Sequence, residues 1–344
     1  MKAVVLNRHG GPEVLDYSDA PEPTIKSNEV LVEVKACALN HLDIWARGGL
    51  PGIDIPLPHI LGNDIAGVVR EVGALVNWVE AGDEVMLQPG VSCGHCAECL
   101  AGRDNLCRDY DILGYRRPGG YAELVAAPGV NVVPKPKILS WEEAAALPLV
   151  TVTAWHMLVT RAAVQPGEDV LVHAAGSGVG SIGIQIAKLR GARVIATASS
   201  DEKLAKAKEL GADEVVNYSK EDWPKEVKWL TNRRGVDVVF EHTGAATWPG
   251  SIASLKPNGR LVTCGATSGY AAQTDLRQVF YRHITILGSF MGSKSELLAA
   301  MKFVEIGKIR AVVDQVLPLE QARRAHELME DRAQFGKLVL RVAE

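Results

Sequence analysis

Four cysteines form the most specific chemical pattern in the sequence. They follow the spacing C-x₂-C-x₂-C-x₇-C and are Cys93, Cys96, Cys99 and Cys107. Four thiolates at such spacing can close a tetrahedral Zn²⁺ site that has no open position, which makes the site structural. Such a site releases on the order of 10 kcal/mol when the metal binds, enough to fold a loop with little core of its own. Free cysteines or two disulfides are the alternatives. We predict a zinc lobe over about residues 89–110.

A turn of small residues forms the second chemical pattern. It lies between an apolar run at 169–174 and a helical pattern at 182–189. Small residues let the backbone approach a pyrophosphate, and the following helix presents free N–H groups and the positive end of its dipole. The strict G-x-G-x-x-G spacing is not met, because position 181 is serine, and glycine turns also serve simple strand–helix packing. The expected coenzyme contacts are Ala175, Gly176, Ser177, Gly178, Val179 and Gly180.

The strand after this turn determines which coenzyme fits. An NAD enzyme usually ends it with an acidic residue, which accepts hydrogen bonds from the adenine ribose. Here the strand 193–198 is followed by Ser199, Ser200 and Lys203. Two hydroxyls and an ammonium suit a 2′-phosphate better than a diol, so we predict NADPH. Asp201 leaves NADH as the alternative, and Ser200 or Asp201 can instead cap the next helix.

The bulk composition sets limits on the class of protein. A chain of 344 residues exceeds what one hydrophobic core usually serves, so two domains are expected. A net charge of −4 gives no reason to expect nucleic acid or an anionic membrane as partner. The N-terminal apolar run is too short for a signal peptide, and no stretch approaches the roughly 20 apolar residues of a membrane span. We expect a cytoplasmic protein that acts on a small-molecule substrate.

The chain changes character at about residue 150. Before it, the sequence has short runs in which apolar and polar residues partly alternate, separated by glycine and proline. This pattern is typical of β-structure. Ser140 with Glu143 resembles a capping box, and predicts a helix that runs toward Leu147 and stops at Pro148. After it, strands alternate with helices, which predicts βαβ units and a parallel sheet. The expected strands there are 169–174, 193–198, 214–217, 236–241, 260–264 and 284–287, and the expected helices are 182–189 and 201–210. A helix around 321–329 and a strand at 337–342 close the chain.

Together these features resemble the medium-chain dehydrogenase/reductase superfamily, which includes the zinc-containing alcohol dehydrogenases. The matching segments are the cysteine lobe, the Ala174–Gly180 turn, Leu61–Val69, Gly82–Val85 and Gly119–Glu123. The resemblance implies an α/β fold with a GroES-like, β-rich catalytic domain at 1–150 and 291–344. It also implies a Rossmann coenzyme domain, a doubly wound parallel sheet, at 151–290. A homodimer or homotetramer assembled through the coenzyme domains is implied as well.

The sequence departs from the family where the catalytic zinc would bind. The positions of the first ligand and of the family's Gly-His-Glu motif fall on Asn40 and on Gly62-Asn63-Asp64, and the third ligand position falls on Leu149. Leu42 replaces the hydroxyl that would relay a proton. Two amides and one carboxylate are a poor set for zinc compared with imidazole and thiolate. We therefore predict one zinc per chain, and that it is structural only.

The segments 39–43 and 47–50 resemble instead the quinone oxidoreductase and enoyl reductase branch. Members of that branch without a catalytic metal deliver hydride to quinones, enones or enoyl thioesters. The oxyanion formed from such a substrate is stabilised by conjugation, so hydrogen-bond donors can replace a Lewis acid. We predict this activity. One alternative is a zinc-dependent alcohol dehydrogenase for small alcohols and aldehydes, with a metal site rebuilt from His41, His59 and Asp64. Another is a nucleotide-binding scaffold without catalytic activity.

The expected catalytic residues surround the nicotinamide between the two domains, near Thr153. Asn40 and Asn63 are expected to orient the nicotinamide or the substrate oxygen, although Asn63 also suits a simple turn. His41 is a candidate pyrophosphate contact or proton donor, or a partly buried histidine satisfied by a neighbour. Asp43 and Asp64 are expected to hold the network together; capping or surface roles are their alternatives.

Overall fold

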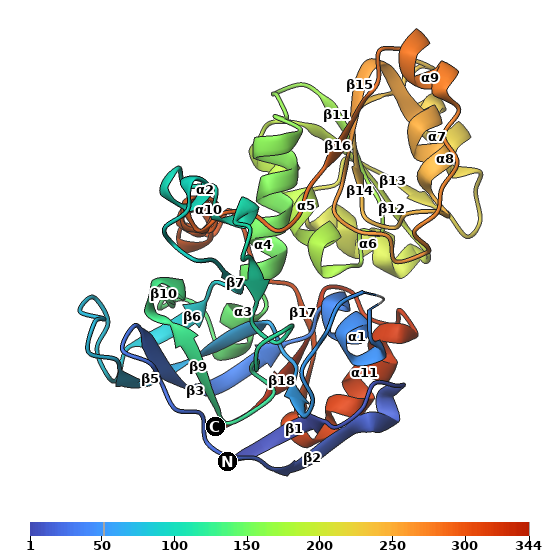
Figure 1. Ribbon diagram of the computed structural model, residues 1–344. Coiled ribbons are helices and arrows are strands. Elements are labelled where there is room, and N and C mark those ends of the chain that lie inside the picture. Colours follow the sequence, from blue (N-terminus) through green and yellow to red (C-terminus); the bar gives the residue numbers. More distant parts are fainter. Residues whose placement is uncertain (51, 344) are drawn as a thin grey trace. The chain divides into compact units, whose positions relative to one another are not determined.

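The computed structural model describes residues 1–50 and 52–343, and the chain divides into two compact units (Figure 1). Unit 1 comprises Met1–Val150, Ser293–Glu305 and Ala311–Glu344, and unit 2 comprises Thr151–Gly292 and Ile306–Arg310. The sequence-based boundaries put the return to the first domain at residue 291 and did not separate Ile306–Arg310. This short segment belongs to unit 2 because Arg310 N–H donates to Gln185 Oε1 at 2.9 Å, and Gln185 Nε2 donates to Arg310 O at 3.1 Å.

The main sheet of unit 1 has seven strands. In order across the sheet they are β10 (Val132–Pro134), β6 (Glu84–Leu87), β5 (Asp64–Val72), β3 (Glu29–Ala38), β18 (Lys337–Arg341) and β17 (Val313–Pro318), and β9 (Leu124–Pro128) also pairs with β3. At one end of β3, Ala38 lies opposite Asp64 on one side and Val339 on the other. This register brings the ends of three strands together, and with them Asn40, Asp64 and Lys337.

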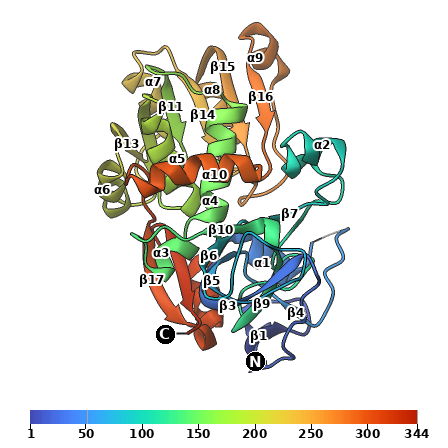
Figure 2. The same cartoon turned by 90° about the vertical axis from the view of Figure 1, so that its left-hand side faces the viewer.

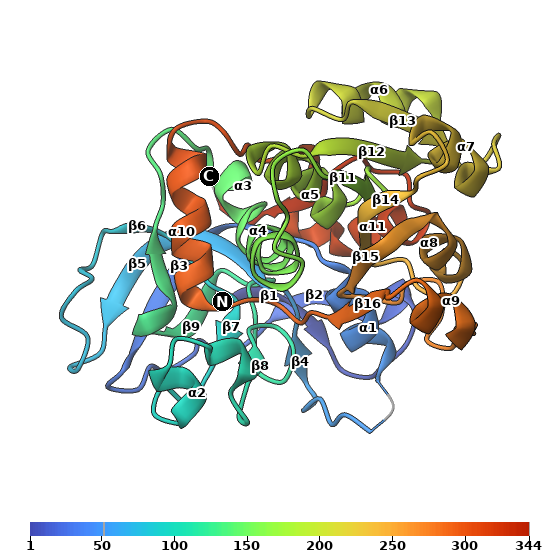
Figure 3. The ribbon, with the colours of Figure 1, turned by 90° about the horizontal axis from the view of Figure 1, so that it is seen from above.

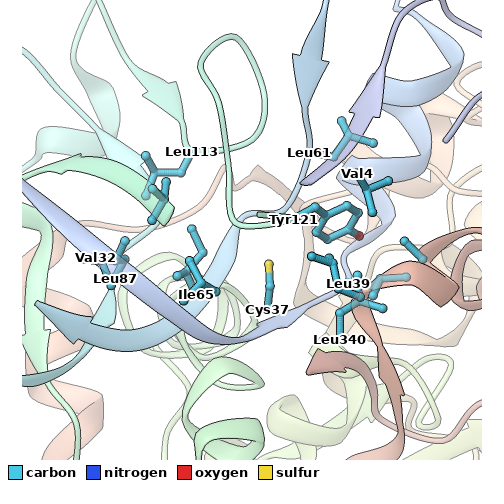
Figure 4. Close-up of a cluster of buried hydrophobic side chains, with 14 of the residues drawn as sticks. Val4, Val32, Cys37, Leu39, Leu61, Ile65, Leu87, Leu113, Tyr121 and Leu340 are labelled. Carbon is cyan, nitrogen blue, oxygen red and sulfur yellow. The ribbon is translucent and has the colours of Figure 1, made fainter. Parts of the chain in front are cut away.

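The core of unit 1 lies against this sheet and is almost wholly apolar. Figure 4 shows Cys37, Leu39, Ile65 and Leu340 from neighbouring strands, with the Tyr121 ring among them. Each of these side chains is at most 1% exposed. Since a fully buried large apolar side chain contributes about 1.5–3 kcal/mol, this cluster fixes the strand ends that carry the polar residues described below.

Smaller elements complete unit 1. A three-stranded sheet has the order β2 (Leu15–Asp19), β1 (Lys2–Leu6), β4 (His59–Ile60). The cysteine lobe contains β7 (Gly90–Val91), α2 (Ala97–Leu100) and β8 (Asp111–Ile112), and α2 lies outside the main sheet (Figure 2). The other helices are α1 (His41–Gly48), α3 (Trp141–Ala145), α10 (Lys294–Glu305) and α11 (Ala322–Glu330).

Two helix predictions in unit 1 need correction. The capping box is confirmed, since Glu143 N–H donates to Ser140 Oγ at 3.2 Å and Ser140 N–H donates to Glu143 Oε2 at 2.9 Å. However, α3 ends at Ala145, and Pro148 begins a helix, α4 (Pro148–Trp155), instead of ending one. Proline is tolerated in a first helical turn, where its missing N–H has no partner to lose. His41–Gly48 also forms a helix, α1, that is not among the elements predicted from the sequence.

Unit 2 contains a six-stranded parallel sheet, whose order can be followed from above (Figure 3). Across it run β13 (Glu214–Asn217), β12 (Arg193–Ala198), β11 (Asp169–Val172), β14 (Val236–Glu241), β15 (Leu255–Thr263) and β16 (Thr285–Gly288). In chain order this is 3-2-1-4-5-6, so the direction of winding reverses between β11 and β14. The predicted α/β class and the doubly wound sheet are confirmed.

The central strands of unit 2, β11 and β14, are buried on both faces, as expected when helices cover a parallel sheet, whereas the edge strand β16 is largely exposed. All six residues of β14 are buried. After α4 comes a π-helix, His156–Arg161, and the helices between strands are α5 (Gly178–Leu189), α6 (Asp201–Glu209), α7 (Trp223–Leu230), α8 (Trp248–Ser254) and α9 (Leu276–Tyr281). The predicted bounds of β12, β13 and β14 are confirmed, whereas α5 begins at Gly178 rather than at residue 182.

Candidate functional site

The small-residue turn lies between β11 and α5, at the point where the sheet reverses. Ser177 caps α5, because its Oγ accepts from Gly180 N–H at 2.9 Å. A Cβ on Gly180 would lie 2.4 Å from Ala174 O, so glycine is required there. Gly178 and Val179 begin the helix, and their N–H groups have no acceptor within it. Together with the half-buried Gly176 and the buried Ala175, they can accept a pyrophosphate at this helix N-terminus.

Some of the residues after β12 form hydrogen bonds within unit 2. Ser200 caps α6, since its Oγ accepts from Lys203 N–H at 3.3 Å. Asp201 is also engaged: Oδ1 accepts from Asn217 Nδ2 at 2.7 Å, and Oδ2 accepts from Lys220 Nζ at 2.6 Å. The neighbouring Ser199 is half-buried. Asp201 therefore has both oxygens occupied, and this strand end presents hydroxyls and ammonium groups.

The strand ends of unit 2 carry a buried polar network that is not predicted from the sequence. Glu241, at the end of β14, is 0% exposed. Its Oε1 accepts from Thr243 N–H at 2.7 Å and Gly244 N–H at 3.1 Å, and its Oε2 accepts from Ser251 Oγ at 2.6 Å. Burial opposes ionisation, but the neighbouring His173 and these hydrogen-bond donors keep the pKa of Glu241 below its ordinary value. The carboxylate thereby holds the loop after β14 in place. An acidic residue at the carboxyl end of a buried strand was the available signal.

His173, at the end of β11, joins this network. Burial lowers the pKa of its imidazole to about 4, so the ring is neutral. Its Nε2 is 3.0 Å from Ser251 Oγ, and its Nδ1 is 3.1 Å from Thr197 Oγ1. Because the Ser251 hydroxyl donates to Glu241, it accepts from Nε2–H, and Nδ1 accepts from Thr197. The ends of β11, β12 and β14 are thus tied together below the coenzyme turn.

Thr153 lies in the part of α4 that belongs to unit 2. Its side chain is buried, and its Oγ1 has no hydrogen-bond partner among the described residues. A buried hydroxyl without a partner is uncommon in a folded protein and is free to bond a ligand.

The four cysteines of the lobe come together in unit 1. Their Sγ atoms all lie within 4.8 Å of one another, with Cys96–Cys99 at 3.5 Å and Cys93–Cys99 at 3.9 Å. A tetrahedral zinc with Zn–S bonds of about 2.3 Å requires S···S separations of about 3.8 Å, so the donor set fits zinc. Backbone N–H groups of His95 and Cys96 lower the pKa of Cys93 to about 6, whereas burial raises that of Cys107 to about 11.

The lobe is attached to α10 through an aspartate. Asp104 Oδ1 accepts from Lys294 N–H at 3.0 Å, and the Lys294 ammonium lies 3.5 Å from Asp104 Oδ2. Lys294 Nζ also donates to Ser92 Oγ at 3.3 Å. These bonds connect the segment around the metal ligands to a helix that follows them in sequence by almost two hundred residues.

Asn40 and Asp64 form a buried network with a lysine that the sequence analysis did not identify. Lys337 Nζ donates to Asn40 Oδ1 at 2.6 Å and to Asp64 Oδ2 at 2.9 Å. Asn40 Nδ2 donates to Asp64 Oδ2 at 2.9 Å. The side chains of Lys337 and Asp64 are 4% and 0% exposed. The signal was a buried lysine at the start of β18, directly before the apolar run 338–340.

The second oxygen of Asp64 is also occupied. Leu149 N–H donates to Asp64 Oδ1 at 2.7 Å. A buried carboxylate that already has an ammonium partner and this N–H donor has little tendency to bind a further cation. The positions of the expected zinc ligands thus hold an internal ion pair, with Leu149 contributing its backbone and no side-chain donor. These residues do not fit a second zinc ion.

Asp43 links the start of α1 to the loop before β5. Its Oδ2 accepts from Asn40 N–H at 2.7 Å, and its Oδ1 accepts from Gly62 N–H at 3.0 Å. The carboxyl group is fully buried, and burial raises its pKa to about 7, against the effect of these two hydrogen bonds. Asp43 therefore supports Asn40 through the backbone.

Asn63 is wholly buried between β5 and the loop after β8. Its Nδ2 donates to Leu113 O at 2.7 Å, and its Oδ1 has no partner among the described residues. Gly62 before it has φ of +102°, and a Cβ there would meet Tyr121 and Cys37. The Asn63 amide nitrogen thus holds the loop after β8 in place, and the amide oxygen remains available to accept a hydrogen bond.

The two histidines near these residues play different parts. His41 begins α1 and is half-buried, with its ring edge-on to Trp45 at 5.0 Å between centroids. His59 is 2% exposed, and burial lowers its pKa. In the described part of the chain, the four cysteines are the one group of three or more His, Cys, Asp or Glu side chains placed to share a metal. His41, His59 and Asp64 do not form such a group.

Among the residues that the structure describes, no helix has the length and apolar character needed to cross a membrane.

Two family patterns match the chain. The pattern of the alcohol dehydrogenase GroES-like domain matches residues 26–137, and that of the zinc-binding dehydrogenases matches residues 178–305. The first range falls within unit 1, and most of the second falls within unit 2.

Individual proteins are similar over nearly the whole chain. A solved structure of an NAD-dependent alcohol dehydrogenase superposes with a TM-score of 0.97 at 55% identity, covering 100% of both chains. A zinc-type alcohol dehydrogenase-like protein of Schizosaccharomyces pombe is 35% identical over 92% of each chain. A crotonyl-CoA carboxylase/reductase of Cereibacter sphaeroides is 32% identical, covering 95% of this chain and 83% of that protein.

Proposed function

Because the chain belongs to the zinc-type alcohol dehydrogenase-like proteins of the medium-chain dehydrogenase/reductase superfamily, and is thus an NAD(P)-dependent oxidoreductase, we propose that its acceptor is an activated, carbonyl-conjugated compound. Quinones, enones and enoyl thioesters make up this class. The zinc ion is structural only, at Cys93, Cys96, Cys99 and Cys107.

The observation that carries this proposal is the ion pair between Lys337 and Asp64. A metal that activates a plain alcohol must bind and stabilise its alkoxide. Here the carboxylate at the expected metal position already has a cation at 2.9 Å, and the amide beside it is bound to the same ammonium. Hydride addition to an activated double bond does not need an alkoxide. It needs hydrogen-bond donors for a delocalised oxyanion, which amides can supply.

A nicotinamide coenzyme, when bound, supplies the hydride. Within unit 2, the turn Ala175–Gly180 and the start of α5 would hold its pyrophosphate. Within unit 1, Asn40 is a buried amide suited to donate to a carbonyl group, whereas the available Oδ1 of Asn63 can accept a hydrogen bond from a ligand donor. The relative from Cereibacter sphaeroides, a crotonyl-CoA carboxylase/reductase, supports the enoyl thioester as one substrate class.

The test is a coenzyme-oxidation screen over quinones, enones, crotonyl and acryloyl thioesters, and simple aldehydes, combined with zinc analysis of the purified protein. We expect turnover with the activated acceptors and one zinc per chain. Turnover of simple aldehydes alone, with two zinc ions and the second essential, would overturn the proposal. If no compound in a broad panel is reduced, a nucleotide-binding scaffold is favoured instead.

The alcohol dehydrogenase alternative is supported by several relatives, among them the solved structure of an NAD-dependent alcohol dehydrogenase at 55% identity and an alcohol dehydrogenase of Geobacillus stearothermophilus at 34% identity. The same screen covers it, because a simple aldehyde is the substrate of such an enzyme in the direction that oxidises the coenzyme. The engaged oxygens of Asp64 argue against it.

For the coenzyme we propose NADPH. The hydroxyl of Ser199 and the ammonium group of Lys203 belong to the segment after β12, where a 2′-phosphate would bind, and Asp201 is hydrogen-bonded to Asn217 and Lys220. We expect kcat/KM to favour NADPH over NADH by at least about tenfold. Ser199→Asp places a carboxylate beside the ribose and should reverse that preference. A tenfold preference of the unaltered protein for NADH would refute this choice.

For assembly we propose a dimer through unit 2. The strand β16 lies at the edge of its sheet, and apolar side chains beside it are exposed: Leu276 by 69%, Phe280 by 60%, Tyr281 by 76% and Ile286 by 40%. A second copy of this chain can pair with the edge and cover these residues. Proteins usually pair or cover an exposed strand edge and a large apolar patch. Light scattering on a size-exclusion column should give a dimer or a tetramer, and Ile286→Lys should reduce it to monomers. A monomeric unaltered protein would contradict the proposal.

A further inference from the structure

The orientation of the Asn40 carboxamide is fixed by its two charged neighbours. An ammonium has only hydrogen-bond donors, so the Asn40 atom 2.6 Å from Lys337 Nζ must be the oxygen. A carboxylate has only acceptors, so the Asn40 atom 2.9 Å from Asp64 Oδ2 must be the nitrogen. The reverse orientation would set donor against donor and acceptor against acceptor.

One hydrogen of this amide remains available. Asn40 Nδ2 carries two hydrogens, and one of them donates to Asp64. Among the described residues, the second has no hydrogen-bond acceptor. Asn40 as a whole is 6% exposed, so this hydrogen lies in a largely water-excluded position. A preorganised donor in such a position is worth more than the same donor in water.

Lys337 acts on that hydrogen through the amide. An ammonium bound to the amide oxygen withdraws electron density from the nitrogen and makes its remaining N–H a stronger donor. In a medium of low dielectric such polarisation along a chain of hydrogen bonds is cooperative. The lysine, 4% exposed at its side chain, is buried enough for this effect.

We propose that Lys337 is a positioning residue, and that it orients and polarises Asn40 so that the free Nδ2–H stabilises the substrate oxyanion. This inference rests on the proposed function. When hydride and its electron pair add to the β-carbon, the π pair of the double bond moves toward the carbonyl oxygen and forms an enolate. Asn40 donates to that oxygen, and a proton from solvent then completes the α-carbon. The internal ammonium thus provides, through an amide, the positive charge that a metal would provide directly.

A purely structural role for Lys337 makes a different prediction. If the lysine only neutralises Asp64, then removing both charges together restores the site. If it polarises Asn40, the double variant Lys337→Met/Asp64→Asn remains slow although no buried charge is left unpaired. This comparison separates the two roles and avoids the folding defect expected of a single substitution.

The experiment measures kcat and KM of the double variant with every carbonyl compound that the unaltered protein turns over, simple aldehydes included. We expect kcat to fall by about tenfold to a hundredfold with KM changed by less than about threefold, since one oxyanion donor is typically worth about a hundredfold or more. In the triple variant that also carries Asn40→Ala, the Lys337 and Asp64 changes should have no further effect, because both act through Asn40.

A matched control uses another buried lysine of unit 1. Lys135, whose side chain is 7% exposed, pairs with Glu84 at 3.0 Å, and Lys135→Met/Glu84→Gln should leave kcat unchanged. Thermal denaturation of all variants checks that they are folded.

Each outcome decides something. A kcat of the double variant equal to that of the unaltered protein overturns the inference, whichever carbonyl compound is the substrate. Turnover of simple aldehydes with a second, essential zinc overturns the proposed function, a result recorded by metal analysis and not by the variants. If the unaltered protein reduces no carbonyl compound, both are wrong.

Discussion

Two regions of unit 1 handle positive charge in opposite ways. The cysteine lobe brings four thiols within 4.8 Å of one another, a set of donors that suits an added metal cation. The cluster of Asn40, Asp64 and Lys337 has one carboxylate, one amide and an ammonium from the chain itself. The first region must import its cation, and the second already contains one.

The two regions also differ in what surrounds them. Cys93, Cys96 and Cys99 are half-exposed, in a lobe of short elements with little core. Asp64 and Lys337 lie at strand ends fixed by the main core of the unit. We expect the metal to fold the lobe, whereas the core positions the internal ion pair.

The largest effect is expected from removing a zinc ligand. Cys107→Ser should abolish tight zinc binding and unfold the segment of about residues 89–110, because metal binding contributes on the order of 10 kcal/mol to such a site. Limited proteolysis with parallel zinc analysis measures this. Full zinc content and unaltered protease resistance would show that the lobe folds without the metal.

The next largest effect should follow from removing the internal cation alone. Lys337→Met leaves Asp64 buried without a charged partner, and we expect a loss of about 3–5 kcal/mol in the free energy of unfolding. Adding Asp64→Asn should recover most of that loss. Urea denaturation provides the measurement. A single variant as stable as the double variant would mean that Asp64 does not need its cation.

Asp43 gives an intermediate, pH-dependent effect, since it lies near the same cluster without an ammonium bound to it. Its carboxyl ionises near pH 4 in the unfolded chain but at about 7 in the folded protein. Between these values the folded state retains a proton that the unfolded state has lost, so stability falls as the pH rises from about 4 to 7.

Asp43→Asn removes this dependence. The stability advantage of the unaltered protein over the variant should therefore shrink across that pH range and stay constant above it, as measured by urea denaturation at several pH values. An advantage that grows between pH 5 and 7 would show that the carboxylate is stabilised in the folded state.

The smallest effect is expected at the attachment of the lobe to α10. Lys294→Ala removes a partly exposed ion pair and the bond to Ser92 but leaves the backbone bond to Asp104, so we expect a loss of about 1 kcal/mol or less. Zinc content should not change. Loss of zinc in this variant would make the attachment part of the metal site.

Local pattern predicted most of the fold. The bounds of β12, β13 and β14 follow from short apolar runs between glycines and polar segments, and the cysteine spacing indicated the lobe. The helix α1 was missed because it is short and lies in a region otherwise typical of strands. Pro148 was interpreted as a helix end although proline equally suits a first turn.

The candidate site was predictable only in part. Asn40, Asn63 and Asp64 could be identified because they replace ligands in a motif that is local in sequence. Lys337 could not, since only the pairing of β18 with β3 brings it to Asn40. The role of Glu241 could not be predicted for a similar reason, because its hydrogen-bond partners come from α8 and from the loop after its own strand.

The distance along the chain between Asn40 and Lys337 has a consequence for folding kinetics. The two residues are 297 positions apart, and all of unit 2 lies between them. Contacts of such long sequence separation carry a high closure entropy and form late. An intermediate in which β3 and β5 have paired before β18 arrives would hold Asp64 without its cation. The final strand therefore completes both the sheet and the charge balance in a single event.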